Sequence, residues 1–550
     1  MKNWESITLG DLGKGFVRYR PFIAILLAIL LAMALLSGAN SGDNDSGEVA
    51  TGFESGGTVV AGAGDETETT NPEGDVIDPA TGQVTRRGGT SGSGSSSNRG
   101  AGTGAAVVPG QALSVPEGSV SANCDPARGR IKVPTNFAPP CVKVNRATGN
   151  DYQGVTKDEI TIVFYRGQSN AATAAALRAA GASDPEEDVR ATIEAYLAYF
   201  SAHYEQYGRK IKLVYKEGSG LPDNDSAGRA DAIDIATRLK AFAVIGDPNN
   251  AYVDELAARK VICICTTSQP QENYEKWAPY AGYTTLMSST QGYVHRAEYI
   301  GKRLTGRKAK WAGTRGTPPV PMSTEDRKFG LLWFETPDGA YKAGIDFFKI
   351  ELKKKYNVTL AADQAFTGAI GPGSDPAKTQ EQARPAIQKM IAAGVNSLAF
   401  SGDPLSPIFF TQEATNQNYY PEWIITGSAL TDTTLFARTY DTNQWQRAFG
   451  ISFLTARLAE ELGDPYRLHV WQHGTTPQAD NSYNVIYAPI WSLFTGIHMA
   501  GPKLTPQTFA QGLFNYPVTG GYITSATISF GRHGLWDMDD YTAYDDVTEI

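Results

Sequence analysis

The sequence predicts an α/β protein built on parallel sheets that are buried on both faces. Short apolar runs alternate with stretches of helical spacing, most clearly between residues 230 and 270. There a helix leads into the apolar run 242–245, and a polar loop and a second helix lead into the run 261–265. Uninterrupted apolar strands between helices are typical of parallel sheets covered on both sides. Such sheets bind ligands in the loops that follow the carboxyl ends of their strands.

The same alternation continues along the rest of the chain and predicts more than one α/β unit. Strands are expected at 160–165, 210–216, 330–334, 358–366, 397–400 and 423–427. Helices are expected at 188–207, 293–304, 339–356, 380–393 and 481–499. A chain of 550 residues is also long enough for more than one domain.

Composition and motifs argue against nucleic-acid binding and against catalysis. The net charge is −9, and no basic stripe is available to neutralise phosphates. The glycines at 368–373 match neither a phosphate loop nor a dinucleotide-binding turn, so we expect an ordinary loop there. No GxSxG elbow provides a hydrolase nucleophile. We therefore expect a protein that is not an enzyme, with no catalytic residues, cofactor or metal.

Two further polar clusters are interpreted as structural. His469 and His473 have i, i+4 spacing, which would suit a metal if helical, but Pro and Gly lie nearby and favour a surface loop. Asp537, Asp539 and Asp540 have no partner base in the sequence around them and are expected to be solvated.

The N-terminus predicts export. Residues 1–20 form a basic N-region with Lys14, Arg18 and Arg20, and an unbroken apolar run of 15 residues follows at 22–36. That length suits a signal-peptide core, and residues 37–39 offer a cleavage site of small residues. The segment 21–39 is thus a signal peptide or an uncleaved anchor helix, and its basic flank places the rest of the chain outside. We expect an extracytoplasmic protein, anchored in the membrane at the cell surface.

The next segment, 40–122, is predicted to be a disordered linker. It is rich in Gly, Ser and Thr, and between residues 41 and 100 ten acids stand against three arginines. Such a composition cannot bury enough apolar surface to become ordered. A linker of this length would serve as a flexible tether for the folded part if the apolar segment 21–39 stays in the membrane.

Four cysteines fall into two pairs. Cys124 and Cys141 bracket a Pro-rich piece within the segment 123–150, and in an oxidising compartment we expect a disulfide between them. Cys263 and Cys265 lie two residues apart on one strand, a poor geometry for a bridge, and are expected to be buried thiols.

A resemblance makes the fold more specific. The helix, the run AFAVIG, the polar loop, the helix and the strand ending in a Thr/Ser-rich loop before Pro270 resemble the first lobe of type I periplasmic binding proteins. Within that fold the chain is most similar to the branched-chain amino-acid (Leu/Ile/Val) receptors of ABC importers, from about residue 151 onward. The resemblance implies two Rossmann-like lobes joined by crossover strands. Lobe 1 is expected to hold 151–286 and 432–505, and lobe 2 to hold 287–431 and 506–550, where 526–536 resembles the closing hairpin of the family.

The resemblance also implies a ligand site between the lobes. In the family, first-lobe hydroxyls and backbone groups hold the carboxylate and amino group of the ligand. Carried over by position, these contacts fall on six residues: Asn249, Asn250, Ala251, Thr266, Thr267 and Ser268. The sequence departs from the family at Asn249 and Asn250, where a serine-rich loop is usual.

Two other departures concern charged residues. In the second lobe, Asp338 occupies a stretch where the family often has an aromatic residue. Asp338 either pairs with a cationic group of the ligand or is a turn residue. Arg166 begins the loop after the first strand, which in the family consists of small residues, and is a candidate contact for an anionic ligand.

The expected function is that of a solute-binding protein. It would capture an amino acid or a similar small polar solute as a monomeric receptor domain and deliver it to an ABC permease in the membrane. The alternative is a membrane-tethered sensor or envelope interaction protein with the same fold and no transport role. An exported hydrolase is a third class, which turnover of a generic ester or glycoside would reveal.

Overall fold

A computed structural model describes most of the chain after residue 112. The described residues are 69–70, 76–77, 84–85, 113–169, 174, 183–336, 339, 341–370, 374–428, 430–453, 460–521 and 525–550. The segments 1–20 and 21–39 lie outside them, so export and anchoring stay predictions. Within the described ranges, no helix combines the length and the apolar character that crossing a membrane requires.

Residues 59–103 form a separate unit, in which three two-residue strands are described. These are β1 (Thr69–Thr70), β2 (Val76–Ile77) and β3 (Val84–Thr85), paired antiparallel in that order. The strands differ from the disordered linker that composition predicts for 40–122. The end of that linker is also corrected, because residues before 123 already bond to the main unit. Leu113 N donates to Arg128 O, and Val144 N donates to Ser119 O, each at 3.0 Å.

Lobe 1 is built on a five-stranded parallel sheet with the order β7-β6-β8-β9-β10. Its strands are β6 (Glu159–Arg166), β7 (Lys210–Glu217), β8 (Ala243–Ile245), β9 (Ile262–Ile264) and β10 (Ala281–Gly282). β8 and β9 are buried along their whole length, as their apolar runs predict. The thiols of Cys263 and Cys265 are free and buried.

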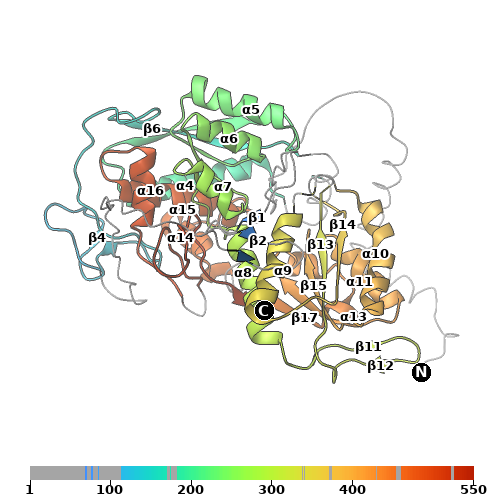
Figure 1. Cartoon of the computed structure of the whole chain (residues 1–550). Coiled ribbons are helices and arrows are strands. Elements are labelled where there is room, and N and C mark those ends of the chain that lie inside the picture. The colour runs from blue at the N-terminus through green and yellow to red at the C-terminus, as the bar shows by residue number, and fades with distance from the viewer. Residues whose placement is uncertain are drawn as a thin grey trace, which may run out of the picture. The chain divides into compact units, whose positions relative to one another are not determined.

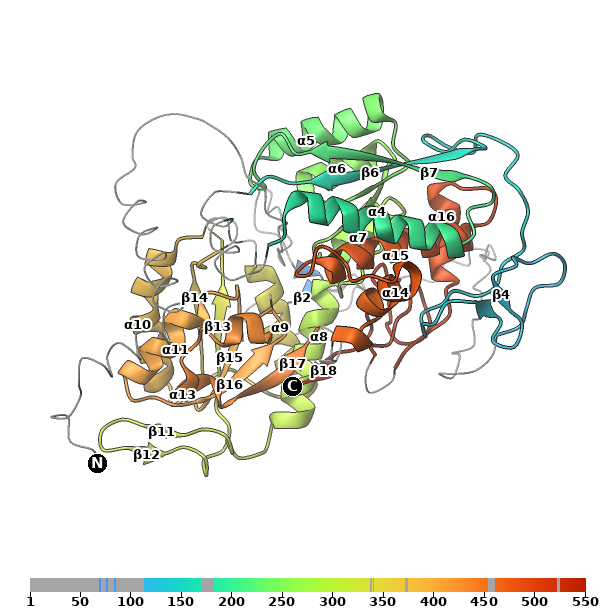
Figure 2. The same cartoon turned by 180° about the vertical axis from the view of Figure 1, so that it is seen from behind.

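Helices cover both faces of this sheet. α5 and α6 lie together on one face, and α4 packs with α14 and α15 on the other (Figures 1 and 2). The helices are α4 (Glu186–His203), α5 (Asp225–Asp234) with a π-helical extension (Ile235–Leu239), α6 (Asn250–Ala258), α7 (Gln271–Trp277), a 3-10 turn (Glu460–Leu462), α14 (Asp464–His473), α15 (Tyr483–Ala500) and α16 (Pro506–Phe514). α15 is apolar on nearly all sides and buried along most of its length, so it forms the centre of the lobe 1 core.

The Pro-rich segment joins lobe 1. A disulfide links Cys124 and Cys141, whose Cα atoms are 5.4 Å apart, around the hairpin of β4 (Cys124–Asp125) and β5 (Arg130–Ile131). Ile131 and Val133 are each 1% exposed and belong to the lobe 1 core. The segment 123–150 is therefore part of this lobe and not a separate piece.

Lobe 2 repeats the architecture with a longer sheet, ordered β14-β13-β15-β16-β17-β18. Its strands are β13 (Phe329–Phe334), β14 (Ala362–Phe366), β15 (Ser397–Ser401), β16 (Glu422–Thr426), β17 (Ala448–Ser452) and β18 (Thr548–Glu549). All are parallel except β18, which runs antiparallel to β17. Every residue of β13 and β16 is buried, as expected for central strands.

The helices of lobe 2 lie on both sides of this sheet. α8 packs on α9 on one side, and α10 packs on α11 on the other (Figure 1). They are α8 (Ser289–Glu298) with a π-helical extension (Tyr299–Leu304), α9 (Lys342–Tyr356), α10 (Pro376–Ala392), α11 (Pro407–Asn416), α12 (Thr434–Ala437) and α13 (Thr442–Trp445). A small hairpin of β11 (Thr314–Arg315) and β12 (Val320–Pro321) precedes β13.

Two boundaries between the lobes differ from the expected ones. Residues 432–453 were expected in lobe 1, but they include β17, which pairs with β16 in the lobe 2 sheet. Residues 506–550 were expected in lobe 2, but α16 packs on α15, and Phe509, Tyr516 and Phe530 are fully buried in the lobe 1 core. Only β18, near the end of the chain, returns to the lobe 2 sheet. The expected hairpin at 526–536 is reduced to single bridges from Ile528 to Thr519 and Tyr544.

Two of the segments that connect the lobes run side by side. Thr284 pairs in parallel with Thr542, and Tyr283 N donates to Tyr541 O at 2.6 Å. Gln291, in the first turn of α8, donates through Nε2 to Asp540 Oδ2 at 2.8 Å. Asp540 is only 1% exposed, so the expectation that it is solvated is wrong. Its carboxylate is enclosed by the connecting segments.

Candidate functional site

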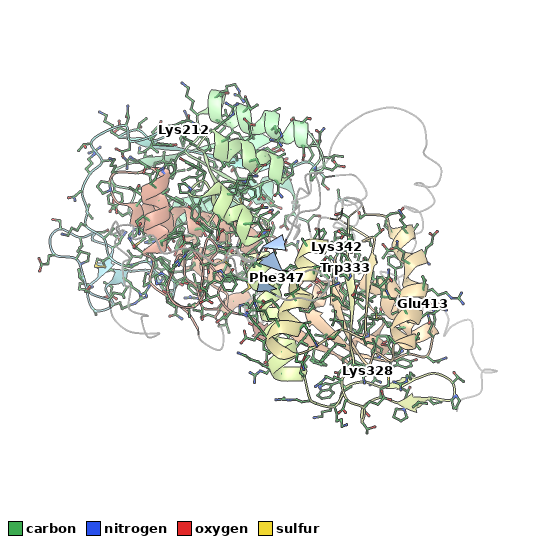
Figure 3. The ribbon with its side chains drawn as sticks, in the orientation of Figure 1. Lys212, Lys328, Trp333, Lys342, Phe347 and Glu413 are labelled. Carbon is green, nitrogen blue, oxygen red and sulfur yellow. A yellow bond between two sulfur atoms is a disulfide. The ribbon has the colours of Figure 1, made fainter. Side chains whose placement is uncertain are left out.

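The strand order of each sheet identifies the edge at which a ligand would bind. In lobe 1 the chain moves from β6 outward to β7 and then returns to β8 on the other side of β6; lobe 2 repeats this with β13, β14 and β15. The crevice at such a switch point, outside the carboxyl ends of the strands, is the usual ligand site of open α/β sheets. Figure 3 shows Lys328, just before β13, and Lys342, at the start of α9, at opposite ends of the lobe 2 sheet. The switch-point loops lie at the Lys342 end.

The loops after β8 and β15 carry the same three residues, Gly-Asp-Pro, at equivalent places in the two lobes. They are Gly246 to Pro248 after β8 and Gly402 to Pro404 after β15. Gly246 has a φ of +101°, and a Cβ there would lie 2.6 Å from Tyr165 O. A Cβ on Gly402 would lie 2.7 Å from the ring of Phe366. Each glycine thus lets its loop pass close to a neighbouring strand, and an aspartate follows directly.

Asp247 organises the lobe 1 loops. Its Oδ1 accepts from Thr266 N at 2.5 Å and from Thr266 Oγ1 at 2.8 Å, and its Oδ2 accepts from Thr267 Oγ1. Burial raises the pKa of Asp247, against the hydrogen bonds from Thr267 and Thr266, which lower it. The carboxylate therefore ties the loop after β8 to the loop after β9.

The expected hydroxyl contacts are thus engaged within the protein. Thr266 and Thr267 are partly exposed, but each donates its hydroxyl proton to Asp247. Ser268 Oγ donates to Met287 O at 2.6 Å. A hydroxyl has one proton to donate and two lone pairs. In this arrangement the three hydroxyls have no further proton to donate, and Thr267 Oγ1 also accepts from Gln269 Nε2 at 3.1 Å.

The other expected lobe 1 residues lie at the start of α6. Asn249 is its N-cap: Oδ1 accepts from Tyr252 N at 3.0 Å, and Nδ2 donates to Pro222 O at 2.9 Å. Asn250 begins the helix, and Ala251 is 4% exposed. An asparagine in place of serine therefore has a structural reason, because it both caps α6 and holds the loop before α5.

Of the two charged residues expected to contact the ligand, the structure describes only Arg166. Arg166, the last residue of β6, forms an ion pair with Glu186 at the start of α4, with Nη1 and Oε2 2.5 Å apart. The hydrogen bond from Arg166 is the largest cause that lowers the pKa of Glu186. Arg166 therefore already has a counter-ion. Asp338 lies outside the described residues, so its role stays a prediction.

Asp403 has the equivalent role in lobe 2 and was not predicted. It is 7% exposed and accepts four hydrogen bonds. Oδ1 accepts from Leu405 N and Ser406 N, each at 3.0 Å, and Oδ2 accepts from Ala369 N at 3.2 Å and Ser406 Oγ at 2.5 Å. Burial raises the pKa of Asp403. The signal that could have identified both aspartates was the Gly-Asp-Pro repeat at the ends of two apolar strands.

The histidine pair is helical, which corrects the expected surface loop. His469 and His473 lie on α14, with ring centroids 4.8 Å apart. Both rings have backbone partners, His469 Nδ1 with Thr475 O at 2.8 Å and His473 Nε2 with Ala195 O at 3.0 Å. Across the described ranges, no group of three or more His, Cys, Asp and Glu side chains is placed to hold a metal ion.

A surface hollow of about 450 Å³ lies elsewhere in lobe 1. It is lined by the end of α4 and the start of β7, including His203, Glu205 and Arg209. The amino end of β7 faces away from the switch point, so this hollow is separate from the loops described above.

Comparison with known proteins gives a likeness of fold. No protein-family model and no curated protein sequence matches the chain. Among solved structures, an ABC transporter substrate-binding protein from Aeropyrum pernix is 13% identical, with 71% of this chain and 91% of that chain covered and a TM-score of 0.48.

Two other solved structures contain bound solutes. A solute-binding protein from R. palustris in complex with 4-hydroxybenzoate is 13% identical over 72% of this chain and 97% of that chain, with a TM-score of 0.44. The branched-chain amino-acid transporter substrate-binding protein of Streptococcus pneumoniae in complex with isoleucine is 12% identical over 72% and 99%, with a TM-score of 0.43. Other solved structures that match at 12–13% identity include a putative branched-chain amino-acid ABC transporter protein from Rhodospirillum rubrum and a type 1 periplasmic binding protein from Bordetella pertussis, with TM-scores of 0.44 and 0.42.

Proposed function

We propose that the chain is an extracytoplasmic solute-binding protein that captures an amino acid or a similar small polar solute between its lobes and delivers it to an ABC importer. The observation that carries this proposal is the repetition of one loop arrangement at both switch points. Each lobe places Gly-Asp-Pro after the strand that follows the reversal, and each aspartate fixes its loop by accepting several hydrogen bonds. Two such edges on lobes with paired connecting segments suit a solute held by both lobes.

The connecting segments support the closing motion that this role needs. Hinge closure uses a few residues between two rigid bodies. The parallel bridge between Thr284 and Thr542 ties two connections together, while each lobe has its own core. We propose that solute binding favours a closed arrangement of the lobes and that the permease recognises this closed form.

Within lobe 1, we propose that the loops of Thr266 to Ser268 and Asn249 to Ala251 contact the solute. The hydroxyls of Thr266 and Thr267 are partly exposed and retain lone pairs, and the first turn of α6 adds backbone N–H groups. The hydroxyl lone pairs suit hydrogen-bond donors on a small solute, and the backbone N–H groups suit an acceptor.

Thermal unfolding of the full chain in the presence of candidate solutes tests the proposal. A ligand that binds only the folded state stabilises it by about 2.7 kcal/mol at a hundredfold excess over Kd. Thr267→Val should reduce the shift by removing the hydroxyl, whereas Thr237→Val, on an exposed face after α5, should leave it unchanged. Failure of amino acids, amides, short peptides and organic acids to shift the transition would refute a solute receptor. If the protein binds a solute but deletion of its gene does not reduce uptake of that solute, the result would instead favour a tethered sensor.

A further inference from the structure

An arginine that the sequence did not single out lies at the ligand-facing edge of lobe 2. Arg296 is on α8, and its Nε donates to the carbonyl oxygen of Thr426 at 2.8 Å. Thr426 is the last residue of β16, so the guanidinium is held at the carboxyl edge of the sheet. The guanidinium carbon is 4.9 Å from the ring centroid of Tyr293 and 5.0 Å from that of Phe453. Phe453 directly follows β17, at the same edge.

Two glycines fix the position of the Phe453 ring. A Cβ on Gly292 or on Gly427 would approach this ring to 3.0 Å, which is closer than ordinary packing permits. The ring is therefore seated between α8 and the loop after β16, and it positions the guanidinium in turn. Arg296 and Phe453 are both partly exposed as residues, while burial of the guanidinium lowers the pKa of Arg296.

Among the described residues, Arg296 has no counter-ion, unlike Arg327 of the same lobe. Arg327 forms an ion pair with Glu422, whose side chain is fully buried. In the part of the chain that the structure describes, no carboxylate lies within ion-pair distance of Arg296; its polar neighbours are Thr426 O and the Tyr293 hydroxyl. An acidic group close to Tyr293, Glu335, accepts hydrogen bonds from Thr336 N at 2.9 Å and Tyr341 N at 3.0 Å in its own loop.

An enclosed cation between two aromatic rings is unfavourable unless something compensates its charge. Arginine stays protonated, and its planar fork can bind a carboxylate through two parallel hydrogen bonds. We propose that Arg296 binds the carboxylate of the solute and that Tyr293 and Phe453 contact the apolar part next to it. This inference rests on the proposed function and names its solute class, small organic carboxylates.

The arrangement places the carboxylate of the solute in lobe 2. The family resemblance implies that first-lobe hydroxyls and backbone groups hold both the carboxylate and the amino group of the ligand. Here, the hydroxyl protons of Thr266 and Thr267 go to Asp247, so these two side chains have only lone pairs to offer. A solute with both an amino or hydroxyl group and a carboxylate would place its donors against lobe 1 and its anionic end against Arg296.

Matched pairs of solutes test this inference on the full chain. L-leucine is compared with L-leucinamide, and 4-hydroxybenzoate with 4-hydroxybenzamide, by calorimetric titration. The wild-type chain should bind at least one carboxylate at least tenfold more tightly than its amide. Arg296→Gln removes charge-assisted hydrogen bonds and should weaken that carboxylate by about 10- to 100-fold. Arg303→Gln, the same change at an exposed arginine on the same helical stretch, should leave its affinity unchanged.

Arg296→Lys provides a second variant in case the glutamine variant does not fold. It keeps the charge but loses the planar fork, so the carboxylate should bind at least fivefold more weakly. Full carboxylate affinity in a folded Arg296→Gln variant, or in Arg296→Lys, would overturn the inference and leave the receptor function intact. If only the amides bound, the carboxylate inference would also be overturned and the receptor function would remain. Absence of binding by every solute tested would overturn the receptor function, and the inference with it.

Discussion

The aspartate that organises the lobe 2 loop is the most direct test of the repeated motif. Asp403→Asn keeps the size of the side chain but replaces one acceptor oxygen with an NH₂ group. Whichever way the amide turns, two of the four hydrogen bonds that the carboxylate accepts lose their acceptor. If Nδ2 takes the position of Oδ2, the hydroxyl of Ser406 can rotate away and the N–H of Ala369 keeps Ser406 Oγ, 3.1 Å away, as its acceptor; if Nδ2 takes the position of Oδ1, the N–H groups of Leu405 and Ser406 lose theirs.

The magnitude follows from these bonds. Two charge-assisted hydrogen bonds are lost, each worth about 1.5–3 kcal/mol before their donors find other acceptors, and each of the two remaining bonds becomes a neutral one, worth about 1 kcal/mol less. Burial raises the pKa of Asp403, so the neutral amide recovers part of the desolvation cost of the carboxylate. We expect a net loss of about 2–3 kcal/mol, which in a lobe-sized domain lowers Tm by about 5–10 °C.

Differential scanning calorimetry and urea unfolding of the full chain measure this loss. Asp326→Asn is the matched control, because the Asp326 side chain is 81% exposed and pairs only with the exposed Lys308. The control should change stability by less than about 0.5 kcal/mol. If Asp403→Asn behaved like the control, the loop after β15 would not depend on its aspartate, and the reasoning from the Gly-Asp-Pro repeat would fail.

Three further predictions concern the connecting segments, the disulfide and the Phe453 ring. Burial raises the pKa of Asp540 to about 6 and that of Asp545 to about 9, so the folded chain binds more protons than the unfolded chain between pH 4 and 9, and stability should fall as pH rises. Asp545→Asn should flatten this dependence and stabilise the protein more at pH 8 than at pH 5, as urea unfolding would reveal; an unchanged pH profile would show that the titration of Asp545 does not cause the dependence. Removal of the disulfide by Cys124→Ala with Cys141→Ala should cost about 3 kcal/mol by the loop-entropy relation, measured by unfolding with and without reductant, and equal stability would contradict it. Gly427→Ala should displace the Phe453 ring and weaken carboxylate binding at least threefold in calorimetric titration, and unchanged affinity would show that the ring has no part in the site.

The sequence predicted the sheets well because their strands are buried on both faces. Runs such as 330–334 and 423–425 have no polar residue, and the structure has β13 and β16 there, each starting one residue earlier than predicted. The division between the lobes was harder. β18 contains only two residues, and it joins the lobe 2 sheet through pairing with Ile451 and Ser452, which are distant in sequence. Nothing in so short a stretch shows which of two sheets it will join.

The sequence could place the candidate loops at the ends of their strands, but it could not show the hydrogen bonds that their side chains make. Apolar runs followed by small polar residues correctly indicated which loops lie at the carboxyl ends of β8 and β9. Whether a threonine there can donate to a ligand, however, depends on what accepts its proton, and that partner lies 19 residues away for Thr266. Asp247 is present in the sequence, but only the fold brings its carboxylate close to Thr266 and Thr267. The same holds for Arg296, whose lack of a carboxylate partner is a property of the space around it and not of its sequence neighbours. A resemblance in loop composition therefore supports the location of a binding edge, whereas the sign of the charge that the edge accepts has to be worked out from its hydrogen bonds.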